Sequence, residues 1–229
     1  HTVKLDGSDM QNTNLSDSAF IQVDFTKIKN KSLAGARLID ASLAHSNLSG
    51  VNLDGVILTQ TSFWKTTLSG LDFTNIGLNK IHGSLFVEAN LSDSNFEGID
   101  LSPKEQHFQV FQNKAYLIRG VTQTSDAEAM ITDELFGEDN NSYWNVKIVS
   151  AEVRGNDLAV NYLFFNSFAR ANLENTNFKN AILWYANFYS ADLTNANLSG
   201  ADLRNAYFAN ADLSNANLSG ANLQGTILD

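Results

Sequence analysis

A five-residue period limits the folds open to this chain more than any other feature. From Leu158 to Leu228 every fifth residue is Leu or Phe, and the same register continues backwards to Val153, Ile148 and Tyr143. A period of five fits neither an α-helix, which repeats every 3.6 residues, nor a strand, which repeats every two. It is satisfied if each pentapeptide forms one straight side and then turns a corner, so that the large apolar residue always points inward.

The N-terminal half carries the same period with two interruptions. One run of Leu, Met and Phe extends from Leu5 to Phe25, and a three-residue step then leads to Ile28. The period continues to Leu78, takes a second three-residue step, and ends at Leu101. We expect a bulge or loop at each step.

Small residues accompany each large one. The consensus is Ala-(Asp/Asn)-(Leu/Phe)-x-x, as in Ala191-Asp192-Leu193-Thr194-Asn195. We call the large Leu or Phe of each pentapeptide its centre. The residue two positions before the centre shares the narrow interior of the coil with it, which favours alanine. Asn, Asp, Ser and Gly suit the corners because they tolerate turn geometry. In the N-terminal half this position is often occupied by a larger residue, which predicts a wider or less regular interior there. These residues are Val23, Val51, Val56, Leu71 and Ile76.

These repeats resemble those of the pentapeptide-repeat proteins, over about 1–101 and 143–229. The resemblance implies an all-β solenoid, a right-handed quadrilateral parallel β-helix in which four pentapeptides make one coil. About nine coils would then stack at about 4.8 Å, with 1–101 and 143–229 as parts of the same solenoid. Well-formed coils are expected from about Val153 onward.

Residues 102–142 interrupt the repeat and contain the only proline, Pro103. A connection longer than about 15 residues usually has a role of its own. Clusters of apolar residues that demand burial, such as Phe108 and Leu117, lead us to predict strands near 107–112 and 115–119. Ser125-Asp126-Ala127-Glu128 is typical of a capping box that opens a helix, here over 125–136. We expect this insertion to dock on the side of the coil.

Six acidic residues and no basic one lie between Asp126 and Asp139. They form an acidic contact surface or a weak cation site, or else the solvated face of the predicted helix, where acidic residues near the N-terminus are favourable. Their spacing does not reproduce an EF-hand.

Outward aromatic residues recur at steps of twenty and predict an apolar patch larger than a soluble monomer normally leaves bare. In one reading the insertion covers the patch; in the other a partner, or a second copy of the chain, binds there. The residues are Trp144, Tyr162, Phe164, Ile182, Trp184, Tyr185 and Tyr189.

The sequence offers no catalytic constellation, cofactor motif or metal site. Asn172, Asp192 and Asp212 form a ladder of polar side chains that we expect to bond corner amides or water rather than a cation. The histidines are scattered and show no metal-ligand spacing; they are His1, His45, His82 and His107. The chain has no cysteine, which excludes thiolate catalysis and disulfides.

The charge of −10 disfavours direct nucleic-acid binding, and no apolar run is long enough to span a membrane. We therefore expect a non-catalytic scaffold that binds another protein, with a homodimer through a coil end or the aromatic face as a further expectation. The alternative, implied by the resemblance, is a DNA-mimicking protein that binds gyrase. Localisation stays open between the cytoplasm and, if His1 is a processed N-terminus, an extracytoplasmic compartment.

Overall fold

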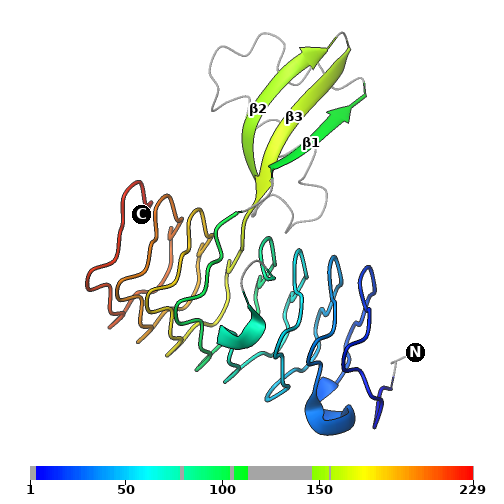
Figure 1. The fold of residues 1–229 in the computed structure, drawn as a ribbon. Coiled ribbons are helices and arrows are strands. Elements are labelled where there is room, and N and C mark those ends of the chain that lie inside the picture. The colour runs from blue at the N-terminus through cyan, green and yellow to red at the C-terminus, as the bar shows by residue number, and fades with distance from the viewer. Residues whose placement is uncertain (1–3, 78–79, 104–105, 113–145, 155, 229) are drawn as a thin grey trace.

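The repeats form a rod of stacked square coils (Figure 1) in a computed structural model that describes residues 4–77, 80–103, 106–112, 146–154 and 156–228. Parallel β-bridges join each coil to the next at steps of twenty in the C-terminal half, as in Asn172↔Asp192 and Asp192↔Asp212. The backbone follows the same steps: the Leu173 N–H donates to the Asp192 carbonyl at 2.7 Å. The fold is the expected right-handed quadrilateral parallel β-helix.

The central Leu and Phe residues fill the interior. Phe178, Leu183 and Phe188 are 0 % exposed, and each full burial of such a side chain stabilises the fold by about 1.5–3 kcal/mol. One side is lined by a column of parallel phenylalanine rings whose centroids lie 4.6–5.1 Å apart, with at most 10° between neighbouring planes; it comprises Phe63, Phe86, Phe168, Phe188 and Phe208. The alanines two positions before the centres, such as Ala181 and Ala186, are buried between them.

The corners explain the rest of the consensus. The second residue after each centre adopts left-handed backbone geometry, as at Asn175 (φ 57°) and Asn195 (φ 58°), which Asn tolerates better than most residues. The Asp or Asn before the centre caps the same turn: Oδ1 of Asp192 accepts a hydrogen bond from the Thr194 N–H at 3.0 Å. Each pentapeptide therefore stabilises its own corner.

Two of the N-terminal coils are longer than twenty residues because they contain short 3₁₀ helices. These are η1 (Phe25–Lys27), η2 (Lys29–Lys31) and η3 (Thr74–Ile76). The Asp24 carboxylate caps η1 by accepting from the Thr26 N–H. Bridges such as Ser42↔Ser62 step by twenty, whereas Ala19↔Ser42 and Ser62↔Leu85 step by 23, so each extra turn adds three residues to one coil. The step expected beyond Leu78 is preceded by η3, and Leu78 itself lies outside the described residues.

Polar residues replace some interior alanines in these longer coils. The hydroxyls of Thr61 and Thr66 donate to the carbonyls of Leu38 and Leu43 in the preceding coil at 2.7 and 2.8 Å. Both threonines are buried. Since their only polar atom is hydrogen-bonded, their burial carries no penalty for an unpaired group.

The interruption of the coils extends over 103–164, which we call the insertion from here on, and it carries a three-stranded antiparallel sheet that stands off from the rod (Figure 1). Its strands are β1 (Gln106–Phe111), β2 (Val146–Arg154) and β3 (Asp157–Phe164), in the order β1-β3-β2. β1 begins one residue before the strand expected at 107–112. The expected strand at 115–119 and helix over 125–136 lie outside the described residues.

The expected resumption of the coils at 143, with good geometry from Val153, is wrong. Residues 146–164 belong to β2 and β3, and the coil resumes at Phe165. Ile148, Val153, Leu158 and Leu163 fit the five-residue register by coincidence. Antiparallel pairing with β1 and β2 buries Leu158 and Val160 in the sheet instead of the rod.

Candidate interaction surface

Seven aromatic and apolar residues were expected to form one patch, and the structure describes the backbone of six of them. Tyr162 lies in the central strand β3, where it is 7 % exposed and burial raises the pKa of its phenol. Phe164 is the last residue of β3, and Trp144 lies outside the described residues. The predicted column of Trp144, Phe164 and Trp184 in three successive coils is therefore wrong for Phe164, which lies in the sheet. Ile182, Trp184, Tyr185 and Tyr189 do lie on the outside of one coil, all half-buried.

Trp184 stacks against Arg204, which lies twenty residues later in the next coil. The Arg204 guanidinium lies over the indole ring, with Cζ 4.1 Å from the ring centroid. The same guanidinium makes two hydrogen bonds to Asp202, from Nε to Oδ1 and from the terminal nitrogen to Oδ2, each 2.8 Å long. A planar guanidinium held by both oxygens of a carboxylate has little freedom left.

The backbone places these three residues. Ile182 bridges to Asp202, and the Tyr185 N–H donates to the Arg204 carbonyl at 3.1 Å. The hydrogen bonds from Arg204 lower the pKa of Asp202, and those to Asp202 raise the pKa of Arg204. The pair is therefore ionised at neutral pH, and its two charges cancel.

Aromatic rings surround the point where the insertion returns to the rod. Phe165, the first coil residue after β3, lies 6.5 Å from Tyr185 between ring centroids. Tyr189 stacks on Tyr207 at 6.0 Å with 6° between the ring planes. We call this set the aromatic corner; it consists of Phe165, Trp184, Tyr185, Tyr189 and Tyr207, all half-buried.

Sequence reasoning missed Tyr207 and Arg204 as members of this surface. Tyr207 follows Asn187 by twenty residues and precedes the central Phe208, a position at which aromatic residues are otherwise rare in this chain. The contact between Trp184 and Arg204 does have a sequence signal, because each residue stands one past the central residue in adjacent coils.

Tyr185 is a corner residue with left-handed backbone geometry (φ 57°), as are other bulky corner residues such as Gln60, Lys65 and Glu88. Asn205 and Gly225 occupy the same corner in the next two coils. A bulky residue there costs roughly 1–2 kcal/mol relative to one suited to that geometry.

A second polar cluster lies on another corner. Glu88 makes ion pairs with Lys65 at 3.3 Å and with Arg170 at 3.8 Å. Lys65 also lies over the Trp64 ring, 4.8 Å from its centroid, and Trp64 contacts His45 edge-on. These ion pairs join coils before and after the insertion, so we assign them to the stability of the rod.

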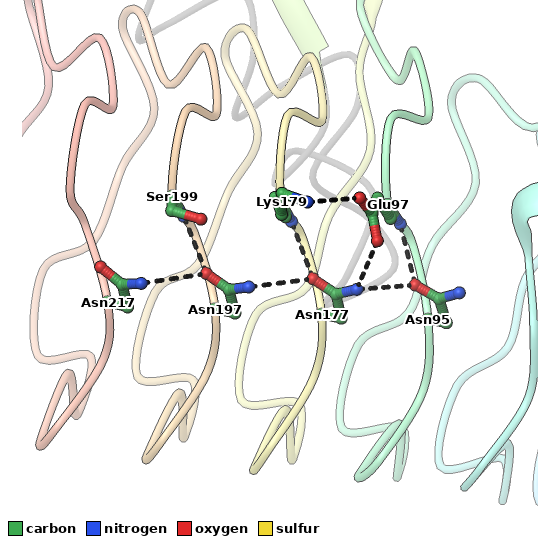
Figure 2. Close-up of polar contacts among 7 residues, drawn as sticks. All are labelled: Asn95, Glu97, Asn177, Lys179, Asn197, Ser199 and Asn217. Atoms are coloured by element: carbon green, nitrogen blue, oxygen red, sulfur yellow. Dashed lines mark hydrogen bonds and ion pairs between the residues drawn. The ribbon is translucent and has the colours of Figure 1, made fainter.

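Asparagines form a ladder along a third side (Figure 2). The Nδ2 of Asn177 donates to Oδ1 of Asn95 at 3.1 Å, and Asn197 and Asn217 extend the ladder at 3.4 Å per step. Glu97 accepts from Asn177 at 3.1 Å and from Lys179 at 2.9 Å. The hydrogen bond from Lys179 lowers the pKa of Glu97.

The polar ladder expected at Asn172, Asp192 and Asp212 bonds corner amides. Their Oδ1 atoms accept from the backbone N–H of Glu174, Thr194 and Ser214 at 2.9–3.0 Å. Within the described ranges, no three His, Cys, Asp or Glu residues are grouped so as to hold a metal ion. Nor does this part of the chain contain a helix long and apolar enough to cross a membrane.

Comparison with known proteins identifies the repeats. The family profile of pentapeptide repeats matches eight copies, at residues 32–75, 165–195 and 191–229. No curated protein gives a significant match.

Among solved structures, the chain is 44 % identical to a pentapeptide repeat protein from the thylakoid lumen of Arabidopsis thaliana, over 27 % of this chain and 46 % of that protein, with a TM-score of 0.25. The chain thus covers less than half the length of that relative. HetL, a pentapeptide repeat protein involved in heterocyst differentiation regulation in the cyanobacterium Nostoc, is 17 % identical over 96 % of this chain and 92 % of its own, with a TM-score of 0.28. QnrB1, a plasmid-mediated fluoroquinolone resistance protein, is 16 % identical over 99 % and 88 %, with a TM-score of 0.31.

Proposed function

We propose that this chain, which belongs to the pentapeptide-repeat family, is a non-catalytic scaffold that binds another protein through the aromatic corner. The observation that carries the proposal is the fixed arrangement of Trp184, Arg204 and Asp202 beside the strained Tyr185.

The residue types fit a binding surface. Trp, Tyr and Arg supply most of the energy in protein interfaces, and they do so from the centre of a well-packed patch. The stacking and the two hydrogen bonds already hold Trp184 and Arg204 in place, so little side-chain entropy remains to be lost on binding.

The charge of the corner indicates the chemistry of the partner. Arg204 is neutralised by Asp202, and the five aromatic residues carry no charge. The surface therefore suits a partner with apolar groups and hydrogen-bond acceptors rather than a polyanion such as nucleic acid.

Capture from an extract of the source cells tests the proposal, with Trp184→Ala compared against Trp64→Ala. Trp64 is a matched control because it also follows a central residue, is half-buried and lies against a basic side chain, but on a different corner. We expect wild type and Trp64→Ala to retain the same partner and Trp184→Ala to lose it with an unchanged far-UV CD spectrum.

Two results would contradict the proposal. If all three proteins retain the same partners, the corner does not bind them. If Trp184→Ala lowers the melting temperature far more than Trp64→Ala, the corner serves the fold, as expected if the insertion covers it.

A gyrase-binding DNA mimic is the second candidate function. The observation that favours it is one side of the rod where four carboxylates make no ion pair with any described residue; they are Asp93, Glu174, Asp192 and Asp212. Duplex DNA, however, carries about one charge per 1.7 Å of its axis, and four carboxylates over four coils are far sparser. We therefore expect micromolar protein to leave DNA supercoiling by purified gyrase unchanged, and inhibition in that assay would favour the mimic instead.

A further inference from the structure

One interior position holds an asparagine where the repeat favours alanine, at the point where the chain returns from the insertion. Asn166 stands two positions before the central Phe168 and is 0 % exposed. Alanine occupies the same position in the next two coils, at Ala186 and Ala206, and is buried there too. The fold of the coil therefore does not require an asparagine at this position.

The side-chain amide of Asn166 is only half satisfied. Its Nδ2 donates to the carbonyl of Ile81 in the preceding coil at 2.8 Å, but its Oδ1 is buried and has no hydrogen-bond partner among the described residues. Thr61 and Thr176 also stand two before a centre and donate to the preceding coil, each through a hydroxyl that is its one polar atom. A buried acceptor without a donor raises the free energy of the closed structure, because it has lost its hydrogen bonds to water.

The backbone next to Asn166 is held by longer hydrogen bonds than the rest of these coils. The residue before each centre donates its N–H to a carbonyl of the preceding coil. Ser167 donates in this way to Ser84, and Asn187 donates to Asn166, each at 3.2 Å. On the other three sides of the same two coils the corresponding bonds measure 2.8–3.0 Å; their donors are Asn172, Asn177, Ile182, Asp192, Asn197 and Asp202. The coils are therefore joined least firmly on the side of Asn166.

Two residues of the aromatic corner depend on this side of the rod. Oδ1 of Asn187 accepts a hydrogen bond from the Tyr189 N–H at 2.9 Å, and Asn187 forms a parallel bridge with Tyr207. The rings of the two tyrosines stack on each other. A movement of the backbone at Asn187 therefore reaches both rings.

We infer that the rod opens locally at Asn166, while its other three sides stay closed, and that Tyr189 and Tyr207 move with this opening. Opening gives the unpaired Oδ1 access to water, which offsets part of the cost of breaking the bonds donated by Ser167 and Asn187. Partner-binding segments are drawn from the less stable parts of a structure, because they must adjust to what they bind.

The stacked rings of Phe86, Phe168 and Phe188 limit the size of this opening. They hold the three coils together inside the rod, so the opening is confined to the backbone at the corner. Its use by a partner rests on the proposed function. The opening itself is a property of the free protein, so the two proposals can fail separately.

Amide hydrogen exchange on the full chain without a partner, followed by NMR, tests the inference. We expect the N–H groups of Ser167 and Asn187 to have protection factors at least about tenfold lower than those of Asn172 and Asp192, their counterparts on the next side. Equal protection of these four groups would overturn the inference.

Asn166→Thr tests the cause of the opening. Threonine keeps a donor for the Ile81 carbonyl, as Thr61 does for Leu38, and removes the unpaired acceptor. Exchange at Ser167 should slow by about tenfold, and the melting temperature should rise by at least about 2 °C.

Two further variants complete the test. Asn166→Ala, which copies Ala186, should also slow the exchange of the Ser167 N–H. Thr176→Ala is the matched control, because it changes a fully bonded interior residue on another side of the same coil, and it should leave that exchange unchanged. If neither variant of Asn166 slows the exchange, or if Thr176→Ala slows it equally, the inference is wrong.

Discussion

The rings of Phe86 and Phe168 stack face to face, with centroids 5.0 Å apart and 5° between their planes, although the whole insertion separates them in the sequence. The backbone matches this contact, because the Phe86 N–H donates to the Ser167 carbonyl at 2.7 Å. The repeats on both sides of the insertion therefore form one continuous rod.

Removing residues 103–164 should leave that rod folded. The deletion joins Ser102 to Phe165 and produces Leu101-Ser102-Phe165-Asn166-Ser167-Phe168, in which the two centres are again five positions apart. Far-UV CD and a cooperative thermal transition would check this. A deletion of 103–163 adds one residue and breaks the period, so it should melt earlier; equal melting of both would show that the register at this corner is unimportant.

Phe168→Ala should destabilise the protein by about 3–5 kcal/mol. Phe168 is 0 % exposed and stacks between Phe86 and Phe188, so alanine leaves a cavity in the middle of the column. Phe168→Leu should cost less than half as much, because Leu43 occupies the same column further along the rod. Urea unfolding measures both, and similar losses for the two variants would be inconsistent with cavity formation.

Asn177→Asp isolates the donor side of the asparagine ladder. The change keeps the Oδ1 that caps the Lys179 N–H but removes the two bonds from Nδ2 to Asn95 and Glu97, and it sets a carboxylate beside Glu97. We expect a loss of about 1–3 kcal/mol. Asn217→Asp, which removes one bond at the end of the ladder, should change stability by less than about 0.5 kcal/mol, and a larger effect there would contradict this assignment.

Asp202 should contribute to the acid sensitivity of the protein. Its pKa is lowered in the folded state, chiefly by the hydrogen bonds from Arg204. The unfolded chain therefore binds the proton first, and the stabilisation is present above the unfolded pKa of about 3.9 and is lost as pH falls through the lower, folded value.

Asp202→Asn removes this contribution. The difference in unfolding free energy between wild type and variant should be constant from about pH 5 to pH 7 and shrink below about pH 4. Chemical denaturation across this range measures it. An equally large difference at pH 3 would mean that ionisation of Asp202 is not its cause.

Tyr185→Asn should separate stability from binding. Asn at this corner, as at Asn205 in the next coil, relieves the left-handed strain, so we expect the protein to become more stable by about 1 kcal/mol. The same variant should bind the partner captured by wild type more weakly, a trade typical of functional positions. A variant that is less stable and binds normally would assign the tyrosine to the fold.

The solenoid could be predicted from the sequence because its determinants are local. Each pentapeptide supplies its own buried residue and its own corner, as the Asp192 cap of Thr194 illustrates. The register failed at Leu158 and Leu163 because β3 carries apolar residues on both of its faces, and these two happen to stand five positions apart. Asn156 and Asn161, two positions earlier, depart from the alanine rule, but so does Asn166 before the coil centre Phe168, so this position does not mark the limit of the repeat.

The interaction surface was only partly predictable. Trp184 was predicted to point outward from its place one past the central residue. That place does not show which neighbour the side chain contacts, and in the structure the contact is with Arg204 in the next coil. Contacts between coils depend on side-chain choice in the next repeat, which a period alone does not give.

The way in which the insertion joins the rod has a wider consequence. The chain leaves after Ser102 and returns at Phe165, two positions that are consecutive within one pentapeptide, while the hydrogen bonds between coils continue. This corner is therefore a suitable site for domain insertion. A foreign domain whose own ends lie close together could be inserted there without redesign of the domain or the rod.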